Sequence, residues 1–392
     1  MQDLQRDDER WEQVRARYPA QEPLLNLNTA AVSPPARVVE QAVIEAFRLI
    51  SRNPDINMWS GLDASLPSTK EALATFVDCD PAEIALNRNS TEGLSTVIFG
   101  VQMHAGDEVV VSEWDYPSSL GGWQQRASRE GIRVVRVRFD PLDDDDAIVR
   151  AYAAALTSRT RVMQLTQMLH WTGRVLPAQR LCEMARERGV LSLVDGAQTF
   201  AQVPVSFRSL DCDYFVTSLH KWLGAPVGNG MLIVRRDRIA STWPLMAPFE
   251  DVPERIDKFD HWNLGTYNSA LQAGIGPAIE AYREVGVQAM HARLRELTRY
   301  WVALARSIRG FRLHTPIDDE RLAAVSLFSI DGADMKHVER ELRERHQVHV
   351  KYRCVGPIEG LRVSPHVYTR KFELQRFVEA LDRVLGPQGR QA

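Results

Sequence analysis

Several features that would assign a chain to a specialised class are missing from this sequence. Its 392 residues include 48 basic and 51 acidic side chains, which leaves a formal net charge of −3. This balance provides no concentration of positive charge for a nucleic acid or an anionic membrane. No apolar run reaches the roughly 18 residues that a membrane-spanning helix needs, and the first residues lack the apolar stretch of a signal peptide. We therefore expect a protein that binds no nucleic acid, spans no membrane and resides in the cytoplasm.

Cysteine is scarce as well. Four cysteines occur, Cys79, Cys182, Cys212 and Cys354, and no two of them form a CxxC pair. Their scatter argues against a disulfide framework and against a zinc knuckle. The histidines add no pattern of metal ligands, so we expect no metal site.

The middle of the chain alternates short apolar runs with amphipathic stretches. Hydrophobic residues make up 44% and charged residues 25% of the sequence, as in soluble globular proteins. Apolar runs predict strands at 107–114, 133–139, 161–166, 190–195, 214–219 and 230–236. Helical patterns between them cover 118–130, 147–156 and 178–188. This alternation predicts an α/β fold with a mainly parallel sheet and helices on both faces.

The pattern changes after about residue 275, and 392 residues are enough for two domains. A long helical stretch at 279–308 leads into a segment at 323–329. A helix near 336–345, a strand near 349–352 and a last helix at 372–385 follow. We therefore expect an N-terminal segment, 1–30, that packs near the small domain, a large domain, 31–275, and a small α+β C-terminal domain, 276–392.

Two polar segments follow neighbouring predicted strands and carry the chemical signal. One is DGAQ, which begins at Asp195, and the other is SLHKW, which contains Lys221. Ligands of open α/β sheets bind beyond the carboxyl ends of strands, so both segments point to one crevice. Desolvation there would leave a lysine neutral and able to attack an aldehyde, and a nearby acid would pair with a pyridinium nitrogen. Singly, Asp195 could be a helix cap and Lys221 a surface residue, but together in this context they favour a site.

These two segments resemble the cofactor-binding core of the class V aminotransferase group, fold type I. That group includes isopenicillin-N-epimerase-like enzymes, cysteine desulfurases and C–S lyases. The resemblance implies pyridoxal 5′-phosphate (PLP) as cofactor, held by Lys221 as a Schiff base. It also implies that Asp195 pairs with the pyridine nitrogen and that Gln198 donates to the ring 3-oxygen. Ser218 and His220 would bind the phosphate.

Two further segments match in the order that the family shows them, over roughly residues 25–369. Ser90 and Thr91 follow a short predicted strand, 84–87, and open a helix whose free N–H groups suit a phosphate. Alone, the same pattern is equally a helix cap. Thr266 lies in a segment similar to the family's Gly-Thr-Pro-Asn, with Tyr267 in place of the proline. In relatives this threonine reaches the phosphate of the neighbouring subunit, which implies a homodimer with its active site at the interface.

Two residues are candidates for contact with the cofactor ring. Tyr116 follows a predicted strand at the position where desulfurases place a histidine stacked on the cofactor, and an aromatic face suits that task. The alternative is that Tyr116 packs in the core and Trp114 stacks instead. His170 stands where desulfurase-like sequences often carry asparagine. It is a candidate acid or base, or a hydrogen-bond partner of the ring oxygen or the substrate, with a structural role as the alternative.

Arg362 resembles the arginine of the family's Arg-x-Ser segment, which binds the substrate α-carboxylate. Its planar fork can make two parallel hydrogen bonds to a carboxylate, although a surface arginine is the plain alternative. Asn28 is a weaker candidate for the border of the substrate site. Desulfurases carry a nucleophilic cysteine on a loop before this arginine. Only eight positions separate Cys354 from Arg362, a shorter interval than that loop needs, so an incidental Cys354 is favoured.

The leading hypothesis is a PLP-dependent enzyme of the isopenicillin-N-epimerase-like branch that acts at the α-carbon of an amino acid. It would have epimerase, racemase or aminotransferase chemistry, with Lys221 moving the α-proton. One alternative is a cysteine desulfurase or C–S lyase that uses Cys354, and another is a PLP-dependent decarboxylase. A protein of this fold that binds PLP without turnover is a third, against which Lys221, Asp195 and Arg362 argue together.

Overall fold

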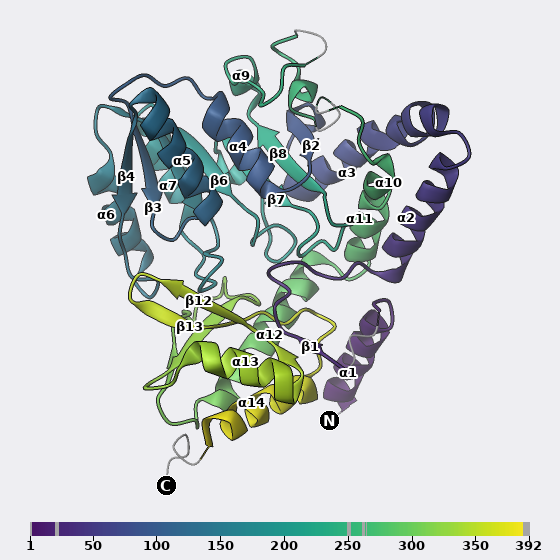
Figure 1. Ribbon diagram of the computed structural model, residues 1–392, viewed down its shortest axis with the longest axis vertical. Helices are drawn as coiled ribbons and strands as arrows, with labels where there is room; N and C mark the ends of the chain where they lie inside the picture. The colour runs from purple at the N-terminus through teal and green to yellow at the C-terminus, as the bar shows by residue number, and fades with distance from the viewer. Residues whose placement is uncertain (1, 20–22, 249–251, 261–262, 264, 387–392) are drawn as a thin grey trace.

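The computed structural model describes residues 2–19, 23–248, 252–260, 263 and 265–386, and Figure 1 shows their arrangement. A large sheet with helices packed against it occupies the upper part of the view. A smaller sheet with its own helices, coloured green to yellow, lies below it. The N-terminal helix lies beside the smaller part, far along the chain from the segments that it contacts.

The strands form three sheets. Their bounds are β1 Leu25–Asn26, β2 Ile84–Asn87, β3 Glu108–Ser112, β4 Arg133–Val137, β5 Thr160–Thr166, β6 Leu191–Asp195, β7 Tyr214–Ser218, β8 Gly230–Val234, β9 Phe311–Leu313, β10 Ser326–Ile330, β11 Val348–His349, β12 Lys351–Val355 and β13 Ile358–Val363. The seven-stranded sheet has the order β2-β8-β7-β6-β5-β3-β4. Neighbours from β4 to β7 are parallel, and β8 pairs antiparallel with both β7 and β2. The predicted mainly parallel sheet is confirmed.

Helices cover the sheets and link the strands. The α-helices are α1 Gln2–Arg15, α2 Arg37–Ile50, α3 Leu66–Val77, α4 Ser90–Gly100, α5 Pro117–Glu130, α6 Asp145–Ala155, α7 Ala178–Glu187, α8 Phe207–Leu210, α9 Arg236–Ile239, α10 Ser269–Gln272, α11 Ile275–Arg283, α12 Val287–Ala305, α13 Met335–His346 and α14 Lys371–Leu385. Shorter helical turns are η1 Ile56–Leu62, η2 Asp63–Ser65, η3 Pro81–Glu83 and η4 Ile256–Phe259. Within the described residues, none of these helices combines the length and the apolar character that crossing a membrane requires.

Alternate side chains of the large sheet enter two separate cores. Leu193 of β6 packs with Leu94 of α4 and Trp123 of α5, whereas the next residue, Val194, packs with Leu181 of α7. A strand that is buried on both faces needs apolar residues at successive positions, which explains the continuous apolar runs in the sequence. Helices therefore cover both faces of the sheet, as predicted.

The smaller part is built on an antiparallel sheet with the order β12-β13-β10-β9. Helices α12, α13 and α14 pack on it around a core that includes Trp301, Phe328 and Phe377. The N-terminal segment contacts this part at several points, among them the parallel pairing of β1 with β11 and a 3.1 Å ion pair between Arg15 of α1 and Glu373 of α14. The domain limits 1–30, 31–275 and 276–392 stay a prediction, with which these contacts agree.

Two predicted elements differ in the structure. The helical stretch predicted at 279–308 is two helices, α11 and α12, because Gly286 has φ +88° and ends the regular helical path. The strand predicted at 349–352 is also divided. One piece, β11, pairs with the N-terminal β1, and the other, β12, forms a hairpin with β13. Pairing of β11 with a strand more than 300 residues earlier leaves no local signal in the sequence.

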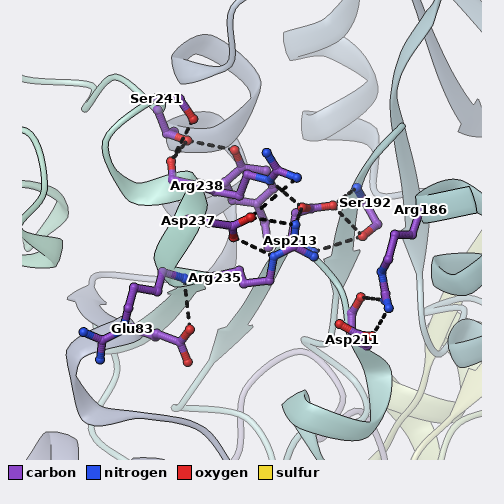
Figure 2. Close-up of polar contacts among 12 residues, drawn as sticks. Glu83, Arg186, Ser192, Asp211, Asp213, Arg235, Asp237, Arg238 and Ser241 are labelled. Carbon is purple, nitrogen blue, oxygen red and sulfur yellow. Dashed lines mark hydrogen bonds and ion pairs between the residues drawn. The ribbon is translucent and has the colours of Figure 1, made fainter. Parts of the chain in front are cut away.

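A buried ionic network fastens the large sheet at the edge where β6 and β7 begin, and Figure 2 shows it. One oxygen of Asp213 accepts hydrogen bonds from Ser192, at 2.8 Å from the backbone N–H. The other accepts from Arg238 at 2.8 Å and forms an ion pair with Arg235 at 2.7 Å. These contacts fix the register of the central strands, so the opposite ends of the same strands can place side chains accurately.

Candidate functional site

A cavity of about 410 Å³ opens beyond the carboxyl ends of β6 and β7. It is lined by Ala30, Ala31, Arg88, Asn89, Ser90, Thr91, Tyr116, Thr166, His170, Asp195, Ala197, Gln198, Ser218, His220, Lys221, Val227, Gly228, Arg353 and Arg362. The lining residues come from the start of α4, the ends of three parallel strands, the N-terminal loop and the small sheet. The crevice that the sequence predicted is therefore present, and most of the predicted site residues line it.

Lys221 and Asp195 form the electrostatic centre of this cavity. Asp195 is buried at the last position of β6, and Lys221 follows β7 by three residues. Burial lowers the pKa of Lys221 from 10.5 to about 8, although the charge of Asp195 opposes that shift. Burial likewise raises the pKa of Asp195, and the charge of Lys221 opposes it. The two groups thus lie close enough for each charge to shift the pKa of the other. About half of the Lys221 side chains are neutral near pH 8.

Four polar side chains gather at the N-terminal end of α4. The Ser90 N–H donates to Ser218 Oγ at 2.9 Å, and the two hydroxyl oxygens are 3.0 Å apart. Thr91 follows in the first turn of the helix, where N–H groups lack helical acceptors and favour an anion. His220 Nδ1 lies 3.0 Å from the Asn229 carbonyl oxygen, so Nδ1 carries the proton. Nε2 can therefore donate to an anion only when His220 is protonated, a state that the anion itself favours.

Gln198 is held on both sides. Its Nε2 donates to the Ala30 carbonyl at 3.0 Å, and its Oε1 accepts from the Trp222 indole at 2.9 Å. These bonds fix which end of the amide faces the N-terminal loop, and the second hydrogen on Nε2 remains for a ligand. The predicted donation to a ring oxygen stays a prediction.

Tyr116 and His170 face each other across the mouth of the cavity. Their ring centroids are 5.3 Å apart in an edge-to-face arrangement. Tyr116 is 37% exposed, while Trp114 is buried and donates through its indole to the Phe139 carbonyl at 3.0 Å. The alternative in which Tyr116 packs in the core and Trp114 stacks on a ligand is therefore wrong. Stacking by Tyr116 on a cofactor stays a prediction.

His170 is buried, and neither of its ring nitrogens has a hydrogen-bond partner in the described part of the chain. Burial, aided by the charge of Arg362, keeps the pKa of His170 well below 6.5, so the ring is neutral. A buried imidazole with two unused nitrogens costs free energy unless a ligand completes its hydrogen bonds. This observation favours a functional His170 over the structural alternative.

Arg362 lies on β13, and its guanidinium is held from two sides. It donates to the His170 carbonyl at 2.8 Å and to Asn28 Oδ1 at 2.8 Å, and Asn28 Nδ2 in turn lies 3.3 Å from His349 Nε2. The Nε of Arg362 is buried without a partner. Asn28 is not among the residues that line the cavity, and it orients Arg362 from behind; its predicted place at the border of the substrate site stays a prediction.

Several polar residues near the cavity were not predicted. Arg353 of β12 and Thr166 of β5 line it, and Asp115 lies directly behind Thr166, which donates to it at 2.7 Å. Burial raises the pKa of Asp115 to about 7. The sequence pattern did not indicate Arg353, because the strand predicted near 349–352 ends one residue before it. Asp115 had a visible signal, since it stands beside Tyr116 after a strand, but its burial depends on the fold.

Thr266 lies apart from this cavity. It is exposed and lines a second hollow of about 330 Å³ with Trp59, Asp63, Leu66, Gly265 and Tyr267. Within one chain, Thr266 therefore contributes nothing to the site around Lys221. This placement suits a residue that serves another subunit, and that role stays a prediction.

Cys354 is exposed and belongs to β12, where it pairs with Glu359 of β13. The hairpin closes tightly, with Val355 opposite Ile358, so the cysteine lies on a paired strand rather than on a long loop. Cys354 is also absent from the cavity lining, whereas its neighbour Arg353 is present. The hypothesis of an incidental Cys354 gains from this geometry.

The donor set suits one kind of cofactor. A lysine with a lowered pKa can bind an aldehyde, and a buried carboxylate can pair with a protonated ring nitrogen. The polar groups of Ser90, Thr91, Ser218 and His220 can hold a phosphate. The unpartnered nitrogens of His170 and Arg362 leave further hydrogen bonds for ligands in the same cavity. Fold and site together therefore define an α/β protein of fold type I whose cavity fits PLP.

The chain belongs to the class V aminotransferase family, because it matches the family described as Aminotransferase class-V over residues 25–377. It is 30% identical to isopenicillin N epimerase of Amycolatopsis lactamdurans, over 95% of this chain and 98% of that protein. It is 29% identical to a cysteine desulfurase of Synechococcus elongatus, over 77% of this chain and 50% of that protein. The chain is accordingly a PLP-dependent enzyme, and a role limited to binding the cofactor is set aside.

A solved structure supports the fold. A variant of C-DES, described with glycine covalently linked to its PLP cofactor, superimposes on this chain with a TM-score of 0.84. The identity is 20%, and the match covers 94% of this chain and 98% of that one. The predicted fold type I is confirmed.

Proposed function

We propose that this enzyme acts at the α-carbon of an amino-acid substrate, with epimerase or racemase chemistry or aminotransfer. The observation that carries the proposal is the shared cavity of Lys221, Asp195 and Arg362. When bound, PLP supplies an aldehyde that condenses with an amine and a ring that withdraws electrons from the α-carbon. The full-length likeness to isopenicillin N epimerase supports α-carbon chemistry that changes configuration.

Lys221 is the residue that we assign to the α-proton. A pKa of about 8 means that the amine is a base near neutral pH without being fully protonated there. Asp195 would hold a proton on the ring nitrogen of the bound cofactor, because a buried carboxylate is stabilised by a nearby positive charge. Arg362 orients the substrate by binding its α-carboxylate with the planar fork that Asn28 holds in place.

His170 is our candidate for a second proton carrier. A change of configuration requires that a proton reach the α-carbon from the side opposite its departure. The neutral ring of His170 can accept a proton on one nitrogen and release it from the other. Tyr116 packs against its edge and limits its rotation, which keeps the ring directed at the cavity.

A cysteine desulfurase or C–S lyase is the second candidate, because relatives of that kind match over most of the chain. The position of Cys354 on a tight hairpin, outside the cavity, disfavours it. We expect no sulfide from cysteine or cystine, and an unchanged α-proton exchange rate in Cys354→Ala. Sulfide release that depends on Cys354 would replace the present proposal.

We further infer a homodimer with its active site at the interface. Phe47, Ile56 and Trp59 are each more than half exposed, and Trp59 borders the hollow that contains Thr266. Exposed aromatic and aliphatic side chains in one region favour burial against another protein surface. A second subunit there would bring Thr266 toward the phosphate end of its partner's cavity. The cytoplasmic location stays a prediction from the sequence.

The test of the proposed reaction is a panel of amino acids incubated with the PLP-loaded enzyme in D₂O. Proton NMR would follow loss of the α-hydrogen, and chiral chromatography would follow configuration, each with and without an added 2-oxo acid. We expect deuterium at the α-carbon with either inversion or 2-oxo-acid-dependent loss of the amine. Release of carbon dioxide would support the decarboxylase alternative instead.

A further inference from the structure

The cavity contains one guanidinium group that neither the assigned cofactor contacts nor the α-carboxylate uses. Among the described lining residues, Arg88, Lys221, Arg353 and Arg362 are cationic, and Asp195 is the one acid. An uncompensated cation in a partly desolvated cavity is costly, so its retention indicates an anionic ligand.

Three of the four cations already have a partner or a task. Arg88 donates to Glu92 at 2.9 Å and is mostly exposed. Lys221 is assigned to the cofactor's aldehyde and Arg362 to the α-carboxylate. The phosphate has its own donors at the start of α4. Arg353 is left without an assignment.

Among the described residues, no carboxylate serves as a counter-ion for Arg353. Its Nε is buried and has no hydrogen-bond partner there, and Nη1 donates to the Tyr352 carbonyl at a long 3.4 Å. No carboxylate in the described part of the chain lies within ion-pair distance of Arg353. Burial lowers the pKa of Arg353, and Glu339 is the carboxylate whose charge opposes this shift most. The carboxylate of Glu339 lies 3.6 Å from the Lys351 ammonium instead.

The guanidinium is nevertheless held in a defined position. Its central carbon lies 5.1 Å from the centre of the Trp171 ring, and Trp171 is the residue directly after His170. The strand pairing of β12 with β13 places Arg353 opposite Gly360, two residues before Arg362. The two arginines are close enough that the charge of Arg353 lowers the pKa of Arg362, which burial already reduces to about 9. Two like charges held this close to each other favour anionic groups of a ligand beside them.

We propose that the substrate carries a second acidic group besides its α-carboxylate, and that Arg353 binds this group while Arg362 binds the α-carboxylate. The ligand class is therefore a dicarboxylic amino acid or a larger amino acid with a distal carboxylate. This inference rests on the proposed function, because it takes Arg362 as the site of the α-carboxylate. It assigns a role in substrate specificity to Arg353 of β12, the residue directly before Cys354 in the sequence.

The experiment uses PLP-loaded enzyme and carboxylic acids that lack an amino group, so that binding is measured without turnover. Isothermal titration calorimetry, in a buffer free of carboxylate and phosphate, compares diacids with monoacids of equal length: succinate with butyrate, glutarate with valerate, and adipate with hexanoate. A charge-assisted hydrogen bond contributes about 1.5–3 kcal/mol, so the best diacid should bind at least roughly tenfold more tightly than its monoacid.

Two variants locate the effect. Arg353→Gln removes the charge but keeps a polar side chain. Diacids and monoacids should then bind with about equal affinity, while monoacid binding itself persists. Lys351→Gln is the matched control: it removes a cation from the same strand, outside the cavity lining, and should keep the preference. If Arg353→Gln does not fold, Arg353→Lys serves, and it should retain the preference in reduced form because it keeps a charge without the planar fork.

The outcomes separate the inference from the proposed function. Equal affinities for diacids and monoacids in the wild-type enzyme would overturn the inference, and so would a preference that survives in Arg353→Gln. A protein that acquires no visible cofactor band on addition of PLP would overturn the proposed function instead. Diacid preference that disappears only with Arg353 supports the second acidic group.

Discussion

Individual residues of the site owe their chemistry to the ends of parallel strands. Asp195 ends β6 and Ser218 ends β7, so both open onto the same crevice, and Lys221 follows within one turn. Because parallel neighbours end at the same edge of a sheet, polar residues that are 23 to 26 positions apart in the sequence become neighbours. The sequence could therefore predict this group before any coordinates were known.

Cofactor capture by the apoprotein should depend on pH through Lys221. Its pKa is lowered to about 8, so the neutral amine that attacks an aldehyde predominates above that pH. Stopped-flow absorbance should show a capture rate that increases with pH and levels off above about 8. An ordinary lysine would make the rate climb toward its usual 10.5, and that outcome would contradict a desolvated Lys221.

His170→Asn should separate a catalytic from a structural histidine. Removal of an acid–base group should lower α-proton exchange by roughly 10²–10⁴-fold, while the cofactor band persists. Because burial keeps the pKa of His170 well below 6.5, the wild-type rate should show no titration of this residue between pH 7 and pH 8. An exchange rate that changes only in step with the melting temperature would indicate a structural role.

Other site residues could not be predicted because their positions depend on distant contacts. Arg353 reaches the cavity only through the pairing of β12 with β13 and the docking of the small sheet on the large one. Asn28 orients Arg362 across 334 positions of sequence. Such contacts have no local period or spacing, so a single sequence contains no signal for them.

At the scale of elements, the loop after β5 is clamped between the two sheets. Thr315 donates to the Thr172 carbonyl at 2.5 Å, and the Gly173 N–H donates to Leu169 at 2.8 Å. A Cβ on Gly173 would lie 1.8 Å from the Val325 carbonyl oxygen, and its φ is +74°. This loop carries His170 and Trp171, so the small part of the molecule directly fixes the mouth of the site.

Gly173→Ala should therefore be costly. The left-handed backbone costs about 1–2 kcal/mol and the forced displacement of Val325 about 1–3 kcal/mol more, for a loss of roughly 2–5 kcal/mol in the free energy of unfolding. Gly189→Ala is the matched control, because it has φ +66° but open space around its Cβ, and it should lose only the backbone contribution. Denaturant unfolding measures both. Equal losses would show that the close approach of Val325 does not matter.

Element boundaries were predicted well where the pattern is local. The predicted strand at 84–87 coincides with β2, and the helix predicted at 178–188 matches α7, which is followed by Gly189 in the left-handed conformation. The break at Gly286 and the division into β11 and β12 were not predicted. Apolar spacing continues through both. The helix breaks at Gly286, whose φ is +88°, and the strand is divided because β11 pairs with the distant β1.

At the scale of the whole molecule, the exposed side of α2 and η1 requires an explanation that one chain does not provide. Phe47 and Trp59 are each 58% exposed there. The fold class and the cofactor followed from the sequence because they rest on segments near the strand ends. The proposed assembly rests instead on Thr266, which lies beside Trp59 and apart from the cavity around Lys221.

Mixed dimers should restore a site that neither variant has. Thr266→Glu places a carboxylate where the partner's phosphate would bind, and Lys221→Ala removes the covalent anchor. In a mixture of the two, one site per hybrid dimer combines an intact Lys221 with an intact Thr266, so covalent PLP binding and α-proton exchange should reappear. Trp59→Glu should yield monomers by analytical ultracentrifugation. No complementation by hybrid dimers would contradict an active site that spans the interface.

The central claim is that Lys221 binds PLP covalently, and absorbance spectroscopy with borohydride fixation tests it most directly. Wild-type protein loaded with PLP should show a visible band that borohydride removes, and peptide mapping should place the fixed pyridoxyl group on Lys221. Lys221→Ala should show neither the band nor the label, although PLP can still bind through the phosphate donors. A wild-type protein without the band after addition of PLP, or a label fixed on another lysine, would contradict the account.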